Sequence, residues 1–195
     1  MKKRELKRVR IVQAAARGFA ESGFSGTTIR RISQEAAAGK GTVYEYFSSK
    51  EELFFAVFEW MMQTFGTDVL KQVAVQEKAS VQARLQAMAE TLLGQWLEML
   101  DLYSLVMEFW SASASLLRRN RFKESFNLAY RDFRLIVASL LREGIASGEL
   151  RSDIDSDSVA AVLVGSFDAL LLQAWFDNEF APLETVRGFW DALFR

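Results

Sequence analysis

The sequence predicts a protein built only of α-helices, about nine of them, with a small N-terminal domain joined to a larger C-terminal one. Three observations support this fold class. Apolar residues recur at helical spacing along most of the 195 residues, strand-like alternation is scarce, and the only proline is Pro182. Hydrophobic residues make up 50% of the chain, which is ample for a buried core.

Charge is divided unevenly along the chain. Residues 1–50 hold 11 Lys and Arg against 4 Asp and Glu, whereas residues 51–195 hold 13 against 21. A basic head on an acidic body is typical of a nucleic-acid-binding module attached to a second domain. We therefore place the two domains at 1–50 and 51–195. A basic tail that serves only solubility is the simpler alternative.

The chain has no cysteine and no histidine, which argues against several kinds of chemistry. Disulfides, thiolate nucleophiles, imidazole bases and nearly all zinc sites need one or both of these residues. A metal site made of carboxylates alone has no support in the pattern. Because no nucleophile lies beside a plausible base, we expect no catalytic site, no metal and no cofactor.

The first helix is expected over residues 5–22. Gly23 supplies the left-handed position that ends a helix, and Phe24 can fold back on the apolar stripe that includes Phe19. The basic residues at the start of this helix either follow DNA phosphates or keep the exposed end soluble; they are Lys2, Lys3, Arg4, Lys7, Arg8 and Arg10.

Residues 27–50 predict two short helices joined by a tight turn of small residues. Thr27 or Thr28 can cap the first helix, and the second, over residues 40–47, turns Val43 and Phe47 inward. Small, hydroxylic and aromatic residues then lie on the outward face, with a lysine at its entry: Lys40, Gly41, Thr42, Glu45 and Tyr46. We interpret this segment as a helix-turn-helix whose second helix enters the major groove of DNA.

The segment TTIRRISQEAAAGKGTVYEYFSSKEEL resembles the DNA-binding signature of the TetR (AcrR-like) family of bacterial transcriptional regulators. The resemblance covers about the first quarter of the chain, and its GTVYEYFSSKEEL portion is highly specific. It implies DNA contacts at the matching positions, which are Thr28, Lys40, Gly41, Thr42, Tyr44, Tyr46 and Lys50. Where relatives usually read Gly-Val-Ser, this chain has Ala37, Ala38 and Gly39, so a looser turn is expected.

Glu45 is an acid on the face expected to meet DNA. Its carboxylate either accepts a hydrogen bond from the N4 amino group of cytosine or turns away from the phosphates into solvent. Because each chain offers one recognition helix, two copies related by a two-fold axis would read a palindromic operator.

The following helix is expected to start at Ser48 or Ser49, where a glutamate three residues later completes a capping box in each case. The helix should continue toward Val69. Gly66 lies within this stretch, so the helix either ends near Gly66 or bends there as a hinge.

The middle of the chain, residues 96–133, carries eight aromatic residues. They form plain core, or part of a cavity for a small apolar or cationic effector, and the family resemblance favours the cavity. Its candidate lining residues are Trp96, Met99, Tyr103, Met107, Trp110, Phe126 and Tyr130. A cationic ligand is favoured if Glu98, Asp101 or Glu108 faces the cavity, and a neutral ligand if all three face water.

A helix over about residues 158–176 is apolar nearly all round and therefore needs cover on every face. We expect it to pair with its symmetry mate, together with a last helix that starts near Pro182, in a four-helix homodimer interface containing Leu171 and Trp175. The resemblance implies the same arrangement. A membrane span is disfavoured because Asp168 lies near the middle of the segment, so a cytoplasmic protein is expected.

Together these features predict a DNA-binding transcriptional regulator, a repressor whose operator affinity is lowered by a small ligand. The alternative is a regulator of the same fold that has no small ligand. A solid, well-packed C-terminal domain would favour that alternative.

Overall fold

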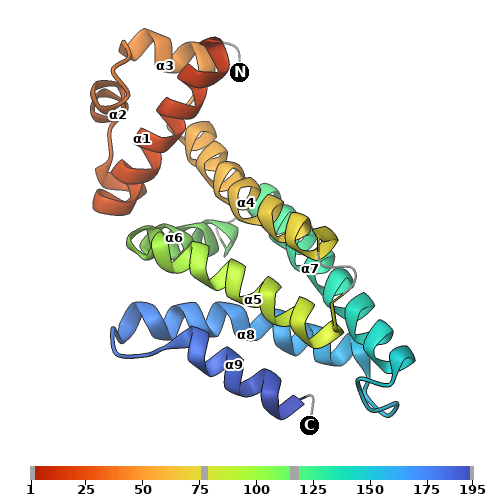
Figure 1. The fold of residues 1–195 in the computed structure, drawn as a ribbon. Coiled ribbons are helices and arrows are strands. Elements are labelled where there is room, and N and C mark those ends of the chain that lie inside the picture. Colours follow the sequence, from red (N-terminus) through yellow and green to blue (C-terminus); the bar gives the residue numbers. More distant parts are fainter. Residues whose placement is uncertain (1–2, 76–78, 115–118, 194–195) are drawn as a thin grey trace. The chain divides into compact units, whose positions relative to one another are not determined.

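The computed structural model describes residues 3–75, 79–114 and 119–193, with the backbone alone at 65–75 and 119–120. The described residues form nine α-helices and one short 3-10 helix, and they contain no strand, which confirms the all-helical fold class. The helices are α1 (Lys3–Gly26), α2 (Ile29–Glu35), α3 (Lys40–Tyr46), α4 (Lys50–Val75), α5 (Val81–Glu98), η1 (Leu100–Leu102), α6 (Tyr103–Ala114), α7 (Arg119–Ser147), α8 (Ser156–Phe176) and α9 (Pro182–Leu193) (Figure 1).

The chain packs as two compact units. The first consists of residues 1–64 and 101–124, and the second of residues 65–100 and 125–195. The division falls inside α4 and inside α7, and it assigns α6 to the unit that contains α1, α2 and α3. This division describes how the chain packs. The boundary at residue 50 separates two expected functions, and it stays a prediction.

An aromatic cluster forms the centre of the first unit. Phe54 of α4 lies 5.2 Å from Phe19 of α1 and 4.9 Å from Phe109 of α6, measured between ring centroids. Phe58 lies 5.2 Å from both Phe109 and Phe122. Such ring pairs contribute about 0.5–1.5 kcal/mol each beyond their buried area, so this cluster holds α6 firmly against α1 and α4.

Most of the helix boundaries follow the signals in the sequence. The backbone leaves the helical conformation at Gly23, where φ is 68°, and Phe24 stacks on Phe19 with the centroids 5.8 Å apart. Gly148, with φ of 79°, follows the end of α7. Asp155 caps α8 by accepting a hydrogen bond from the Asp157 N–H. The helix end predicted at Gly23, with Phe24 folded back on Phe19, is confirmed.

The helix α4 is capped by Ser48, Ser49 and Glu52, and it is longer than expected. The Ser49 hydroxyl accepts the Glu52 N–H at 3.1 Å, and the Glu52 carboxylate accepts the Ser48 N–H at 2.6 Å. The Ser48 hydrogen bonds are the main reason that the pKa of Glu52 lies below its ordinary range. The helix continues to Val75, so the expectation that it ends near Gly66 is wrong.

In the second unit, α5, α8 and α9 pack against one another (Figure 1). Arg187 of α9 donates to Glu90 of α5 at 2.7 Å, and the Val81 N–H at the start of α5 donates to Glu149 at 2.8 Å. The hydrogen bond from Arg187 is also the main reason that the pKa of Glu90 is lowered. These bonds hold the start and the middle of α5 within its unit.

One face of α8 is uncovered in the single chain. Val162 is 70% exposed and Phe176 is 74% exposed, although both are large and apolar. Leu171 faces its own unit and is only 2% exposed, so its expected place in the dimer interface is wrong, whereas Trp175 is 38% exposed. Among the described residues, α8 alone is long and apolar enough to span a membrane by length and composition.

Candidate nucleic-acid interface

The helix-turn-helix is anchored by three fully buried apolar side chains. Ile32 of α2, Val43 of α3 and Phe47, which follows α3, are each at most 3% exposed. Because these residues point inward, the opposite face of α3 is left to solvent, with Lys40, Gly41, Tyr44 and Glu45 exposed and Thr42 and Tyr46 half-buried. The expected inward and outward faces of α3 are therefore confirmed.

The turn between α2 and α3 is closed by two main-chain hydrogen bonds. The Ala37 N–H donates to Gln34 O at 3.1 Å and the Ala38 N–H to Ser33 O at 2.9 Å, which is the Schellman pattern of a helix end. This pattern places Ala37 in the left-handed region, with φ of 47°. Gly39 caps α3 with an extended backbone and no side-chain hydrogen bond.

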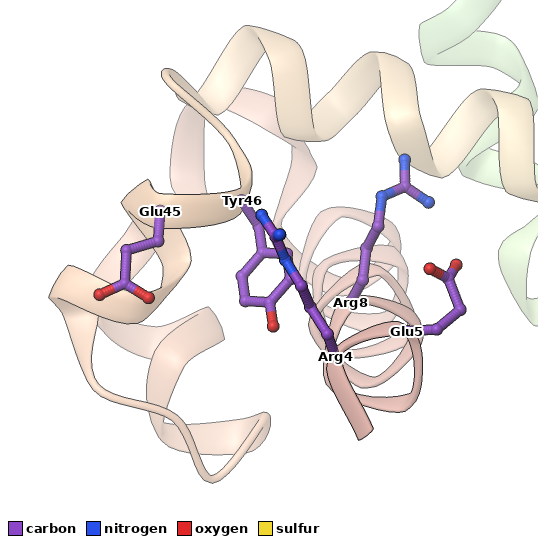
Figure 2. A pocket seen from close by; sticks show the side chains of 5 residues that line it. All are labelled: Arg4, Glu5, Arg8, Glu45 and Tyr46. Carbon is purple, nitrogen blue, oxygen red and sulfur yellow. The ribbon is translucent and has the colours of Figure 1, made fainter. Parts of the chain in front are cut away.

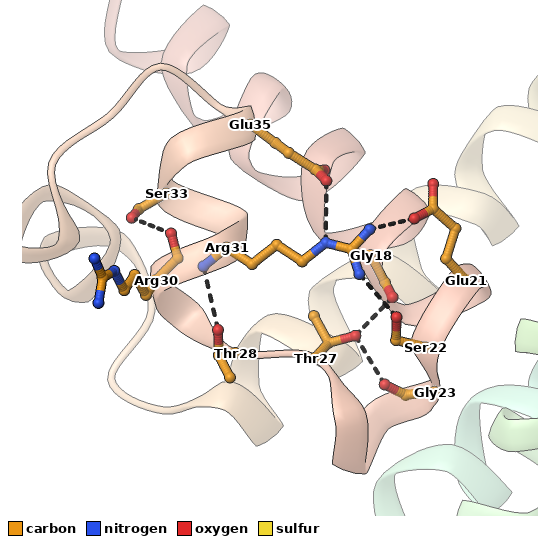
Figure 3. A network of polar contacts seen from close by, with 10 residues as sticks. All are labelled: Gly18, Glu21, Ser22, Gly23, Thr27, Thr28, Arg30, Arg31, Ser33 and Glu35. Carbon is orange, nitrogen blue, oxygen red and sulfur yellow. Dashed lines mark hydrogen bonds and ion pairs between the residues drawn. The ribbon is translucent and has the colours of Figure 1, made fainter.

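A polar network joins α2 to the end of α1 (Figure 3). The Arg31 guanidinium donates to Glu21, to Ser22 Oγ at 2.8 Å and to Glu35 at 3.3 Å. Glu21 first, and then Glu35, raise the pKa of Arg31. These contacts fix the position of α2 on α1, and thereby the base from which α3 projects.

Two of the predicted DNA-contacting residues also make bonds within the chain. The Thr28 hydroxyl caps α2 by accepting the Arg31 N–H at 3.2 Å. The Lys50 ammonium donates to Phe24 O at 2.7 Å and to Thr27 O at 3.1 Å, and it lies 4.3 Å from the centre of the Phe24 ring. Lys50 therefore holds the loop between α1 and α2, and its contact with DNA stays a prediction.

A depression of about 550 Å³ lies between the start of α1 and the end of α3. It is lined by Arg4, Glu5, Arg8, Glu45 and Tyr46 (Figure 2). The Arg4 guanidinium lies 5.7 Å from the centre of the Tyr46 ring, and that of Arg8 lies 5.5 Å from the Phe47 ring. The sequence indicated a basic helix start, but it did not indicate that two of its arginines meet α3.

Glu108 links α6 to the end of α1. Both of its carboxylate oxygens accept the Phe24 N–H, at 2.8 and 3.0 Å, and Ser104 donates to Ala20 O at 3.2 Å. A Cβ at Gly23 would lie 2.8 Å from Glu108 Oε1, so only glycine suits this approach and the positive φ. Glu108 thus serves an internal contact.

The seven candidate ligand residues fall in both units. Tyr103, Met107 and Trp110 belong to α6 in the first unit, and Tyr103 is fully buried there. The remaining four belong to the second unit. Trp96 is buried there, and Met99, Phe126 and Tyr130 are half-buried. Their joint role as a cavity lining stays a prediction.

Asp168 is a potential functional residue that the sequence did not single out for binding. Its carboxylate accepts the Tyr130 hydroxyl at 2.5 Å, and Phe126 stacks on Tyr130 with the ring centroids 6.3 Å apart. Burial raises the pKa of Asp168, while the hydrogen bond from Tyr130 acts in the opposite direction. The signal in the sequence was an acid within an otherwise apolar helix.

A three-helix N-terminal module with an exposed α3 and a helical C-terminal portion define a helix-turn-helix regulator. Comparison with known proteins gives the family. The model "Bacterial regulatory proteins, tetR family" matches residues 11–57, and "BetI-type transcriptional repressor, C-terminal" matches residues 81–194. The chain therefore belongs to the TetR family, and it is a DNA-binding transcriptional regulator. Members of this family bind DNA and act as dimers.

Three relatives illustrate the similarity. The fatty acid metabolism regulator protein of Bacillus subtilis is 24% identical over 179 residues, 92% of this chain and 88% of that protein. A regulator of Saccharomonospora viridis in complex with choline is 23% identical with a TM-score of 0.78, covering 95% of this chain and 93% of that one. The FadR regulator of B. subtilis in complex with stearoyl-CoA is 20% identical with a TM-score of 0.72, covering 95% and 97%.

Proposed function

We propose that this regulator is a homodimeric repressor that reads a palindromic operator with the outward face of α3. The observation that supports this most is the burial of Val43 and Phe47, which leaves the polar and aromatic face of α3 to solvent. The contacts would come from Thr42, Tyr44 and the other matched residues, with Glu45 at the base edges or turned away. We further propose that the protein acts in the cytoplasm and has no catalytic activity.

The DNA-reading surface can be tested by selecting an operator from random duplexes and measuring fluorescence anisotropy. Tyr44→Phe removes one hydroxyl, so affinity for all sequences should fall about three- to tenfold and the salt dependence should weaken. Glu45→Ala should relax preference at one base pair, whereas Glu59→Ala, an exposed acid on α4, should change neither property. Wild-type affinity and selectivity in both variants would remove these residues from the interface.

We propose that the effector is a lipophilic organic cation that contacts Asp168. The acids named from the sequence are poorly suited to this role, because Glu98 and Asp101 are exposed and Glu108 is bonded to the Phe24 N–H. Asp168 instead accepts a hydrogen bond from the Tyr130 hydroxyl, and Phe126 stacks on Tyr130, so an acid and an aromatic pair come together. Charge pairing and cation–π contact both favour a quaternary ammonium group there.

Calorimetry with choline and benzyltrimethylammonium, compared with stearoyl-CoA, tests the effector class. The cations should bind, raise Tm and lower operator affinity, and Asp168→Asn should weaken their binding at least tenfold, about 1.4 kcal/mol. Glu124→Gln, an exposed acid on α7, is the matched control. If only stearoyl-CoA binds, the effector is an acyl-CoA and not an organic cation. If none of the three compounds binds, the regulator without a small ligand is favoured.

A further inference from the structure

The first two turns of α1 hold two arginines against the end of the recognition helix. Arg4 and Arg8 are four residues apart, so they lie on one face of α1. Their guanidinium groups meet two successive aromatic rings, with Arg4 5.7 Å from the Tyr46 ring and Arg8 5.5 Å from the Phe47 ring. Figure 2 shows Arg4 alongside Tyr46, with Arg8 beside it at the same depression.

Neither arginine forms an ion pair with another side chain among those that the structure describes. Their charges therefore stay available to an external anion. A guanidinium that rests on an aromatic ring is attracted to the negative face of that ring, and it loses less side-chain entropy when it then binds. The free edge of the guanidinium can still donate to a phosphate with two parallel hydrogen bonds.

We propose that Arg4 and Arg8 form a phosphate clamp for the DNA backbone beside α3, with Tyr46 and Phe47 as positioning residues. This inference rests on the proposed reading of DNA by α3. Glu5 and Glu45 also border the depression, and Glu45 points away from both arginines in Figure 2. These acids weaken the site for a small free anion, so a phosphate brought in by DNA bound to α3 is the favoured occupant.

The clamp assigns Tyr46 a role that differs from a direct hydroxyl contact with DNA. If the ring positions Arg4, then Tyr46→Phe still holds the Arg4 guanidinium, because the ring and its negative face remain. Tyr46→Leu removes that face and releases Arg4. The effect of Tyr46→Leu should then vanish in a chain that already lacks Arg4, since the ring acts through the arginine.

The test is the affinity of the full chain for its selected operator over a series of salt concentrations. Arg4→Gln should weaken binding about three- to tenfold and reduce the slope of log affinity against log salt by about 0.9, the value for one phosphate contact. Arg17→Gln is the matched control, since Arg17 is exposed on α1. It lies about 20 Å further along the helix axis, so slope and affinity should stay near wild type.

The Tyr46 variants complete the test. Tyr46→Phe should bind the operator more tightly than Tyr46→Leu, Tyr46→Leu should match Arg4→Gln, and the double variant of Arg4→Gln and Tyr46→Leu should be no weaker than either single one. Inorganic phosphate at matched ionic strength should not compete with the operator. Circular dichroism melts verify that each variant is folded. Arg8→Gln should independently reduce the slope of log affinity against log salt.

Several results would overturn the clamp while leaving the proposed function intact. One is equal slopes for Arg4→Gln and Arg17→Gln with normal operator binding by wild type. Another is a loss in Tyr46→Phe as large as that in Tyr46→Leu, which would assign the phosphate contact to the hydroxyl. Competition by inorganic phosphate would identify a general anion site. Failure of the wild-type chain to select any operator would instead overturn the proposed function and the clamp together.

Discussion

Ala37 occupies the position in the turn of the helix-turn-helix where relatives usually have glycine. With φ of 47°, its Cβ is held in the left-handed region, which costs a residue other than glycine about 1–2 kcal/mol. The turn is nevertheless closed by both Schellman hydrogen bonds. The replacement of the family's usual glycine by Ala37 therefore strains the backbone at this residue. It leaves the hydrogen-bonding pattern of the turn intact.

Replacing Ala37 with glycine should relieve this strain. We expect Ala37→Gly to raise the free energy of unfolding by about 0.5–1 kcal/mol, because the steric gain exceeds the extra entropy of glycine in the unfolded chain. Denaturant unfolding monitored by circular dichroism measures the change. Ala38→Gly, whose backbone is not left-handed, should lower stability slightly. A stability loss in both variants would show that Ala37 is unstrained.

Helix α8 carries an apolar surface that a single chain leaves exposed to solvent. Its exposed apolar residues, Val162 and Phe176, need cover that one copy does not provide. We propose that a second copy covers them, with α9 contributing Phe189, which is 46% exposed. Because Leu171 is buried and Trp175 is not, the exposed face differs from the one inferred from sequence alone.

The double variant Val162→Glu/Phe176→Glu should sediment as a monomer. Two buried like charges on each copy would face each other across the two-fold axis, so dimerisation should weaken by well over a hundredfold, about 3 kcal/mol. Leu128→Glu, at a large apolar residue on α7 that is 50% exposed, should stay dimeric. A dimer that persists in the double variant would place the interface elsewhere.

At the scale of the whole molecule, local signals were predicted well and long-range pairs were not. Gly23, Ser49, Asp155 and Pro182 mark helix ends through residues within one turn, so the sequence alone locates them. The bond from the Phe24 N–H to Glu108 joins residues 84 apart, and that from Tyr130 to Asp168 joins residues 38 apart. Such pairs depend on how helices pack, which periodicity within a helix does not specify.

The dependence of stability on pH should carry a contribution from Asp168. Burial raises its pKa above the ordinary 3.8, so the folded chain holds the proton more tightly than the unfolded chain. This contribution is fully present below 3.8 and is lost as pH rises through the folded pKa. The free energy of unfolding of Asp168→Asn, relative to wild type, should therefore increase between about pH 4 and about pH 7.

Urea unfolding of both proteins across this range measures the difference. The lowered pKa values of Glu52 and Glu90 act with the opposite sign, but they are shared by the two proteins and cancel in the comparison. Asn127→Ala, at an exposed residue on α7 that carries no titratable group, is the control and should give a flat difference. A flat difference for Asp168→Asn as well would show that its carboxyl group titrates normally.

The contact between Glu108 and the Phe24 N–H also gives this molecule a built-in spectroscopic reporter. A single amide proton is shared with both oxygens of a carboxylate on α6, and the carbonyl of the same residue accepts the Lys50 ammonium. In a nitrogen–proton correlation spectrum, that resonance should lie downfield and exchange slowly with solvent. Following this one peak through additions of operator or effector would report, in real time, whether α6 keeps or releases its hold on α1.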